Sequence, residues 1–121
     1  MVLGTMTKIS FKRVWNDLIN VLEKDRVVYT LYRKCRNEVA DIFKEKGIQV
    51  ITKRSSPKSH LVPKWMFEVA VNHIREHGSL SNPTLLNTLN VKRSSFVMAA
   101  LSKLDYIEYK TTPIRMFFKH R

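Results

Sequence analysis

Four side chains that suit nucleic-acid binding, Lys92, Arg93, Ser94 and Ser95, stand at the front of the stretch NVKRSSFVMAALSKL, residues 90–104. An arginine can donate two hydrogen bonds to guanine in the major groove, and a helix N-terminus with free hydroxyl groups favours phosphate. The apolar residues that follow recur at helical spacing and can hold such a helix on a core. The pattern predicts noncovalent recognition of a polyanion.

A second set of charged residues raises the question of a metal-dependent nuclease. RNEVADIFKEKGIQVITKR (36–54) and YIEYKTT (106–112) faintly resemble parts of the Holliday-junction resolvases. The resemblance implies Glu38 as a helix glutamate and Glu108 and Lys110 as a strand pair. That family also needs an aspartate on a preceding strand, whereas Asp105 lies on the same short strand as Glu108. We therefore expect no nuclease site and no enzymatic activity.

His73 and His77 are four residues apart, a spacing that can bind zinc on a helix. No HExxH glutamate and no cysteine-rich partner segment accompanies them. His77 before Gly78 suits the C-terminal end of a helix, where the helix dipole favours a cation. We expect no metal and no cofactor.

Charge is the strongest signal in the composition: 22 Lys and Arg against 10 Asp and Glu give a net charge of +12 over 121 residues. The first 63 residues carry 13 of these cations and 6 of the anions, so the excess is spread along the chain. Such an excess predicts a polyanionic partner, because neutralised phosphates release counterions.

Cys35 is the only cysteine, which fits a reducing compartment, and we expect it to be a half-buried helix residue. No apolar run approaches the roughly 18 residues of a membrane helix. The segment MVLGTMTKISFKRVW lacks the apolar core of a signal peptide. We expect a cytoplasmic or nucleoid-associated protein without membrane contact.

The N-terminal half has helical spacing of apolar residues, with Ser10 as a cap. The spacing predicts two helices, about 11–24 and 26–46, or one long helix bent near Asp25, with Gly47 as the C-cap. IQVITKR, residues 48–54, is β-branched and predicts a strand. Residues 55–63, SSPKSHLVP, predict a basic linker or exposed loop.

From Lys64 the pattern changes. KWMFEVAVNHIREHG predicts a helix that Gly78 ends, with Trp65, Phe67 and Ile74 mostly inward. A two-turn helix is expected after Pro83, then the helix of the opening stretch. YIEYK (106–110) and IRMFFKH (114–120) predict a β-hairpin.

This order of elements, with the stripe Leu85, Leu86 and Leu89, VKRSSFVMAALSKL and IEYKTTPIRMFFK, resembles the winged helix-turn-helix superfamily over residues 64–121. That superfamily includes MarR-like and PadR-like regulators and small archaeal, viral and plasmid DNA-binding proteins. The resemblance implies a recognition helix in the major groove, exposed along Phe96, Ala99, Ser102 and Lys103, and a wing that contacts the DNA backbone or minor groove. The DNA-binding residues expected are Lys92, Arg93, Ser94, Ser95, Phe96, Lys103, Lys110, Thr111, Thr112, Arg115, Lys53, Arg54 and Lys58.

The first predicted helix has an apolar stripe that must be covered, either by the chain itself or by a second copy. We expect a homodimer through this stripe: Phe11, Val14, Trp15, Leu18, Ile19 and Leu22. The fold class expected is mainly α with a small β-hairpin: a helical extension at 1–54, a basic linker at 55–63 and a winged-helix domain at 64–121.

The expected function is sequence-specific binding of double-stranded DNA by a dimeric transcriptional regulator. The first alternative is a structural protein that coats DNA, as in plasmid partition or chromatin. The metal-dependent nuclease is the less favoured alternative.

Overall fold

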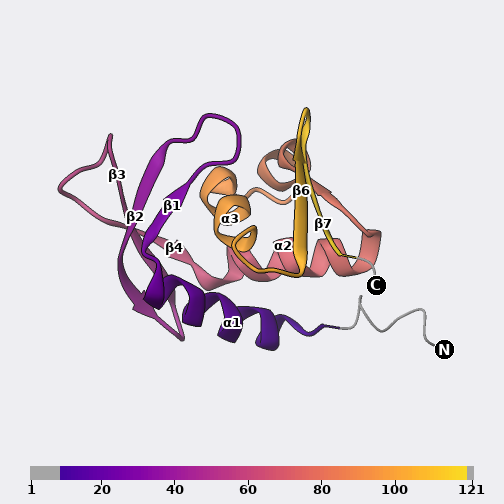
Figure 1. The fold of residues 1–121 in the computed structure, drawn as a ribbon, viewed down its shortest axis with the longest axis horizontal. Helices are drawn as coiled ribbons and strands as arrows, with labels where there is room; N and C mark the ends of the chain where they lie inside the picture. The colour runs from indigo at the N-terminus through magenta and orange to yellow at the C-terminus, as the bar shows by residue number, and fades with distance from the viewer. Residues whose placement is uncertain (1–8, 120–121) are drawn as a thin grey trace.

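The computed structural model describes residues 9–119, which form one helix and a four-stranded sheet followed by three further helical segments and a three-stranded sheet (Figure 1). Helix α1 (Phe11–Lys24) begins at Ser10, whose hydroxyl accepts a hydrogen bond from the Arg13 amide at 3.2 Å. This is the N-cap that the sequence predicts, and it supplies a partner to an otherwise unpaired helix amide.

Strands replace the helix that was predicted over 26–46. These strands are β1 (Val27–Tyr29) and β2 (Arg36–Phe43). Together with β3 (Gly47–Thr52) and β4 (His60–Pro63) they form an antiparallel sheet of order β1-β2-β3-β4, in which each strand pairs with its neighbour in this order. In β2, Asn37 and Val39 are buried while their neighbours are exposed, the period of a strand. The register shifts between Val39 and Asp41, and this irregularity breaks the alternation in the sequence.

Gly47 ends no helix; it begins β3, with a positive φ of 148°. A Cβ at this position would collide with the carbonyl oxygen of Val62 in the neighbouring strand β4. The glycine therefore permits the close approach of two backbones at the start of the β3–β4 pair.

The predicted linker at 55–63 is partly a strand. Residues 60–63 pair with β3, and α2 begins at the next residue after β4. Val62 is buried and belongs to the core. The predicted strand over 48–54 is confirmed as β3, two residues shorter at its end.

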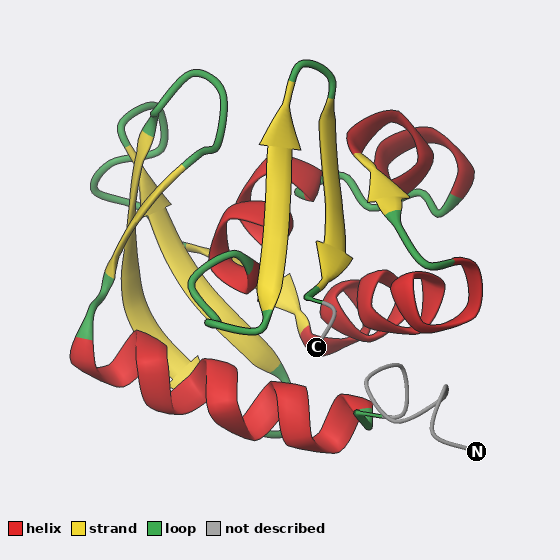
Figure 2. Cartoon of the chain, turned by 45° about the vertical axis from the view of Figure 1, so that its right-hand side comes forward, coloured by secondary structure: helices red, strands yellow, loops and turns green. Residues whose placement is uncertain are grey.

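The C-terminal half contains α2 (Lys64–His77), β5 (Leu80–Ser81), the π-helical turn η3 (Thr84–Thr88), α3 (Ser94–Leu101), β6 (Ile107–Thr111) and β7 (Ile114–Phe118). The three strands form an antiparallel sheet of order β5-β7-β6 (Figure 2). The predicted helix ending at Gly78 and the predicted hairpin are confirmed. The helix after Pro83 is a single π-turn, and Trp65 is exposed rather than inward.

The prediction of a mainly α fold is wrong. Helices hold 39% and strands 30% of the residues that the structure describes, with the strands in one four-stranded and one three-stranded sheet. The error lies in the N-terminal half, where a helical extension was expected and α1 with a four-stranded sheet is found.

Both halves contribute to one core. The ring of Trp15 in α1 packs at a tilt against the ring of Phe67 in α2, with 5.3 Å between the ring centroids. The Phe67 ring in turn meets the ring of Phe96 in α3 edge-on, with 6.3 Å between the centroids. The Trp15 indole donates a hydrogen bond to the Lys44 carbonyl at 2.9 Å. In Figure 1, α3 lies between the four-stranded sheet and the β6–β7 hairpin, and it contacts β1, α1 and α2.

No helix within residues 9–119 is long and apolar enough to cross a membrane.

Candidate nucleic-acid interface

Helix α3, the expected recognition helix, is buried along most of its length. From Phe96 to Leu101 every residue is at most 4% exposed. The prediction that Phe96 and Ala99 lie on an exposed line is therefore wrong. The stretch FVMAAL is apolar on all sides, which is typical of a helix enclosed by protein. Helix α3 contacts β1, α1 and α2, and the ring of Phe96 packs against Phe67 of α2, so the face that was expected to meet solvent lies inside the protein.

The front of α3 remains accessible. Lys92 and Ser95 are exposed and Arg93 is half-buried, whereas Ser94 is buried at 4% exposure. Arg93 is the N-cap residue and makes no capping hydrogen bond with its side chain. Base edges or phosphates can therefore reach α3 at its first turn.

A groove brings Arg93 together with cations from the N-terminal sheet. Its lining includes Arg36 at the start of β2, Lys53 and Arg54 after β3, and Arg93, and it encloses about 560 Å³. Thr52 and Ser55 shape the turn that carries Lys53 and Arg54: the Thr52 amide donates to the Ser55 hydroxyl at 3.0 Å, and the Ser55 amide donates to the Thr52 carbonyl at 3.1 Å.

Three of these cations have no acidic partner. Arg36 lies 3.7 Å from Glu38, but Lys53, Arg54 and Arg93 form no ion pair with any residue between 9 and 119. Uncompensated cations that line a common groove attract phosphate, and the described residues that line this groove include no acidic side chain that would oppose the attraction.

The loop between β1 and β2 adds residues that the sequence did not mark as part of the site. Residues 30–35 read TLYRKC and were assigned to a helix, which hid two cations and an exposed tyrosine in one loop. Thr30 closes the loop: its amide donates to the Cys35 carbonyl at 3.0 Å, and its hydroxyl accepts from the Cys35 amide at 2.8 Å. Cys35 is exposed, so the expected half-buried helix position is wrong.

This loop and the turn between β6 and β7 lie at the same end of the molecule as the front of α3 (Figures 1 and 2). We call this end, which comprises the β1–β2 loop, the β3–β4 loop, residues 92–95 and the β6–β7 turn, the basic end. Of the expected wing residues, Lys110, Thr112 and Arg115 are exposed and Thr111 is half-buried. Arg115 donates a hydrogen bond to the Ser79 hydroxyl at 3.2 Å. Lys58 is exposed in the β3–β4 loop.

Lys103 lies outside the basic end. Its ammonium group donates to the Asp25 carboxylate at 2.6 Å, next to the C-terminal end of α1. This hydrogen bond, together with the charge of Lys103, lowers the pKa of Asp25. Lys103 therefore joins the two halves of the chain and is engaged by a carboxylate.

The stripe expected to form a dimer is covered by the chain itself. Five of its members are at most 8% exposed: Val14, Trp15, Leu18, Ile19 and Leu22. Phe11 is half-buried and stacks on Trp15 at 5.8 Å. The sequence left two ways to cover the stripe, by the chain itself or by a second copy, and in the structure the chain itself covers it. The homodimer stays a prediction, and these five side chains are not available to form its interface.

Among residues 9–119, no three His, Cys, Asp or Glu side chains gather in a way that could hold a metal ion. Glu38 is exposed on β2 beside Arg36. The ring centroids of His73 and His77 are 4.3 Å apart. The pKa of His73 is lowered, mainly by burial of its ring and to a smaller extent by the charge of His77.

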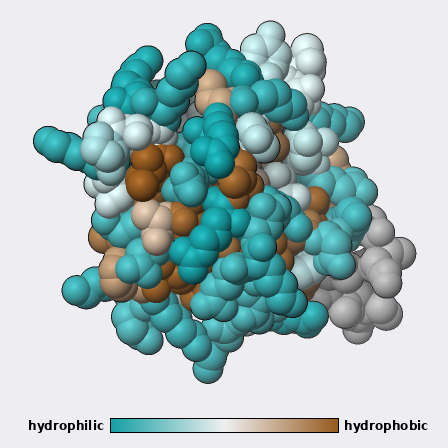
Figure 3. All heavy atoms as spheres, turned by 60° about the vertical axis from the view of Figure 1, so that its left-hand side comes forward, coloured by the Kyte–Doolittle hydropathy of each residue, from teal (hydrophilic) through white to brown (hydrophobic). Residues whose placement is uncertain are grey.

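Seen from the side of the four-stranded sheet, the molecule is largely hydrophilic, with separate small hydrophobic areas (Figure 3). Comparison with protein-family models, curated proteins and solved structures yields no match. The assignment of a function therefore depends on the geometry and charge of the basic end.

Proposed function

We propose that this protein binds double-stranded DNA through its basic end, in the cytoplasm or on the nucleoid. One observation carries the proposal. Arg36, Lys53, Arg54 and Arg93 come from three separate segments and line one open groove, and three of them have no acidic partner among residues 9–119. Cations in such a groove can follow a phosphate backbone, which supplies most of the affinity of nonspecific DNA binding.

The order of elements in the C-terminal half supports the proposal. Helix α2, the helical turn η3, helix α3 and the β6–β7 hairpin follow one another in the order that the winged-helix resemblance implies. The front of α3 and the β6–β7 turn are the parts of such a unit that meet DNA.

We infer a transcriptional regulator that reads few bases. Lys92, Arg93 and Ser95 are the accessible side chains at the front of α3, and Arg93 is the one suited to guanine. The burial of α3 beyond its first turn favours a second candidate, the DNA-coating protein, because phosphate contacts would then outnumber base contacts. The ratio of specific to nonspecific affinity separates the two roles.

The proposal is tested by titrating a fluorescent duplex at several salt concentrations with two triple variants of equal charge. One replaces Lys53, Arg54 and Arg93 by serine. The control replaces Lys12, Lys24 and Lys44, which are exposed on α1 and the β2–β3 turn, at the opposite end of the molecule in Figure 1.

The first variant should flatten the slope of log affinity against log salt by up to about three units, roughly one for each phosphate that is no longer neutralised. The control should leave the slope near that of the wild type. Equal weakening by both variants would mean that binding follows net charge alone, and the groove would have no special part in it.

A further inference from the structure

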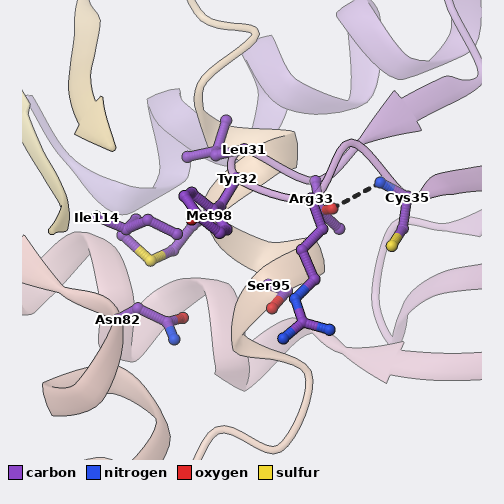
Figure 4. A pocket seen from close by; sticks show the side chains of 9 residues that line it. Leu31, Tyr32, Arg33, Cys35, Asn82, Ser95, Met98 and Ile114 are labelled. Atoms are coloured by element: carbon purple, nitrogen blue, oxygen red, sulfur yellow. Dashed lines mark hydrogen bonds between the residues drawn. The ribbon is translucent and has the colours of Figure 1, made fainter. Parts of the chain in front are cut away.

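A second pocket adjoins the basic groove and differs from it in character. It encloses about 360 Å³ and lies between the β1–β2 loop, α3, the start of η3 and the wing. The residues that matter for its chemistry are Leu31, Tyr32, Met98, Ile114, Asn82 and Ser95 (Figure 4).

One side of this pocket is apolar. Figure 4 shows Tyr32, Met98 and Ile114 gathered on that side. Tyr32 is 67% exposed, which is unusual for so large a side chain and leaves its ring free to stack. A methionine thioether also packs well against aromatic rings.

The other side is polar and carries an unmet hydrogen-bond acceptor. The Oδ1 atom of Asn82 is buried and has no hydrogen-bond partner among the described residues. A buried acceptor without a partner costs free energy that a donor from a ligand would recover. The amide also has two N–H donors, and the exposed Ser95 lines the same pocket, so this pocket suits the edge of a nucleobase.

The pocket and the groove adjoin each other, because Thr30 and Cys35 line both. A base in the pocket would therefore be attached to a backbone whose phosphates lie along Arg36, Arg54 and Arg93. In a fully paired duplex the bases are stacked, so one base must be extruded before it can fill the pocket, and this costs a few kcal/mol. The cost is smallest for a base that is already unpaired.

From these observations we propose that the preferred ligand is duplex DNA with an unpaired base, and that this base stacks on Tyr32 and donates a hydrogen bond from its amino group to Asn82. This inference deepens the proposed function and depends on it. It names the class of DNA that the basic end selects.

The test compares three duplexes of the same flanking sequence: fully paired, with one bulged adenine, and with one bulged abasic residue. Affinities are measured by anisotropy with the full chain. The bulged adenine should bind about tenfold more tightly than the paired duplex, because one base then stacks on an aromatic side chain. The abasic bulge is equally deformable but has no base, so it should show little of this gain.

Two variants and a matched control locate the effect. Tyr32→Ala and Asn82→Ala should each remove most of the preference for the bulged adenine, so that the ratio of its affinity to that of the paired duplex falls close to one. Tyr29→Ala removes another exposed tyrosine, on β1 and outside the pocket lining, and should keep the preference.

Equal affinity for all three duplexes, with the salt slope still dependent on Lys53, Arg54 and Arg93, would overturn the pocket and leave the proposed function standing. A gain shared by the abasic bulge would also overturn it, because deformability would then explain the preference. Failure to bind any of the three would overturn both proposals.

Discussion

At the residue scale, the position of Arg93 at the front of a helix can be predicted from the sequence, but its surroundings cannot. Its place before an apolar helical run marks the front of a helix, and the structure puts it there. Of the residues that share its groove, Arg36 comes from a strand that the apolar spacing predicts as a helix, whereas Lys53 and Arg54 follow a strand that the sequence does predict. Contacts between distant segments depend on tertiary packing, which local spacing does not encode.

We predict that Arg93→Ala relaxes base preference and costs roughly 1–3 kcal/mol in binding to the best site, as expected when a side chain no longer reaches a base edge. Lys12→Ala is the control, since it removes the same charge from α1. Binding to a panel of duplexes at fixed salt measures both effects. If Arg93→Ala changed the binding free energy at the best site by less than about 0.5 kcal/mol, Arg93 would not be a residue that contacts a base.

At the scale of elements, the four-stranded sheet is the feature that the sequence predicts least well. The apolar residues Val28, Leu31, Cys35, Val39 and Ile42 recur at three and four positions, and this spacing predicts a helix. They belong instead to two strands and the loop between them, and the bulge after Val39 shifts the alternation. By contrast, α1 and α2 have single uninterrupted faces and a clear cap or stop, so their spacing predicts them correctly.

The start of β3 gives a prediction with a natural control. Gly47→Ala places a Cβ against the Val62 carbonyl at a positive φ, so the backbone must move, at a cost on the order of 1–3 kcal/mol. Gly78→Ala also meets a positive φ, of 87°, but has open space around the new Cβ. Urea unfolding should show the larger loss for Gly47→Ala. If Gly78→Ala were the more damaging change, the close approach of β3 and β4 would be wrong.

The contact between Lys103 and Asp25 predicts a pH dependence. Because the hydrogen bond and charge of Lys103 lower the pKa of Asp25 in the folded state, the unfolded state binds the proton more readily. The stabilisation is present above the ordinary carboxyl pKa of 3.8 and is lost as the pH falls through the lowered folded value.

Unfolding free energies of the wild type and Asp25→Asn, measured from about pH 7 down to about pH 2, test this. The wild type should be the more stable protein at neutral pH, and the difference should shrink below the ordinary carboxyl pKa. A difference that persists unchanged at the lowest pH would show that the ionised carboxylate is not its cause.

At the scale of the whole molecule, one core unites the segments that were expected to be an extension, a linker and a domain. The rings of Trp15, Phe67 and Phe96 connect α1, α2 and α3. An apolar stripe can be recognised from sequence, but whether it meets its own chain or another copy depends on what the rest of the chain leaves uncovered. Here the unpredicted sheet and α2 complete the cover.

The two tryptophans of the chain test this shared core. Trp15→Ala should cost about 3–5 kcal/mol of unfolding free energy, as large aromatic truncations in cores do, because the side chain is 2% exposed. Trp65→Ala should cost far less, since Trp65 is 46% exposed. Denaturant titrations compare them. If the loss were similar for both, α1 would not be an integral part of the core.

The claim that DNA lies over the basic end is tested most directly at Cys35, the only cysteine, which lines both the groove and the adjoining pocket. The measurement is the rate at which a thiol reagent labels the full chain, with and without a saturating duplex. We predict that the duplex slows labelling severalfold, and that added salt restores the rate as the complex dissociates. An unchanged rate under conditions where anisotropy shows the DNA fully bound would contradict the account, because the DNA would then lie elsewhere on the protein.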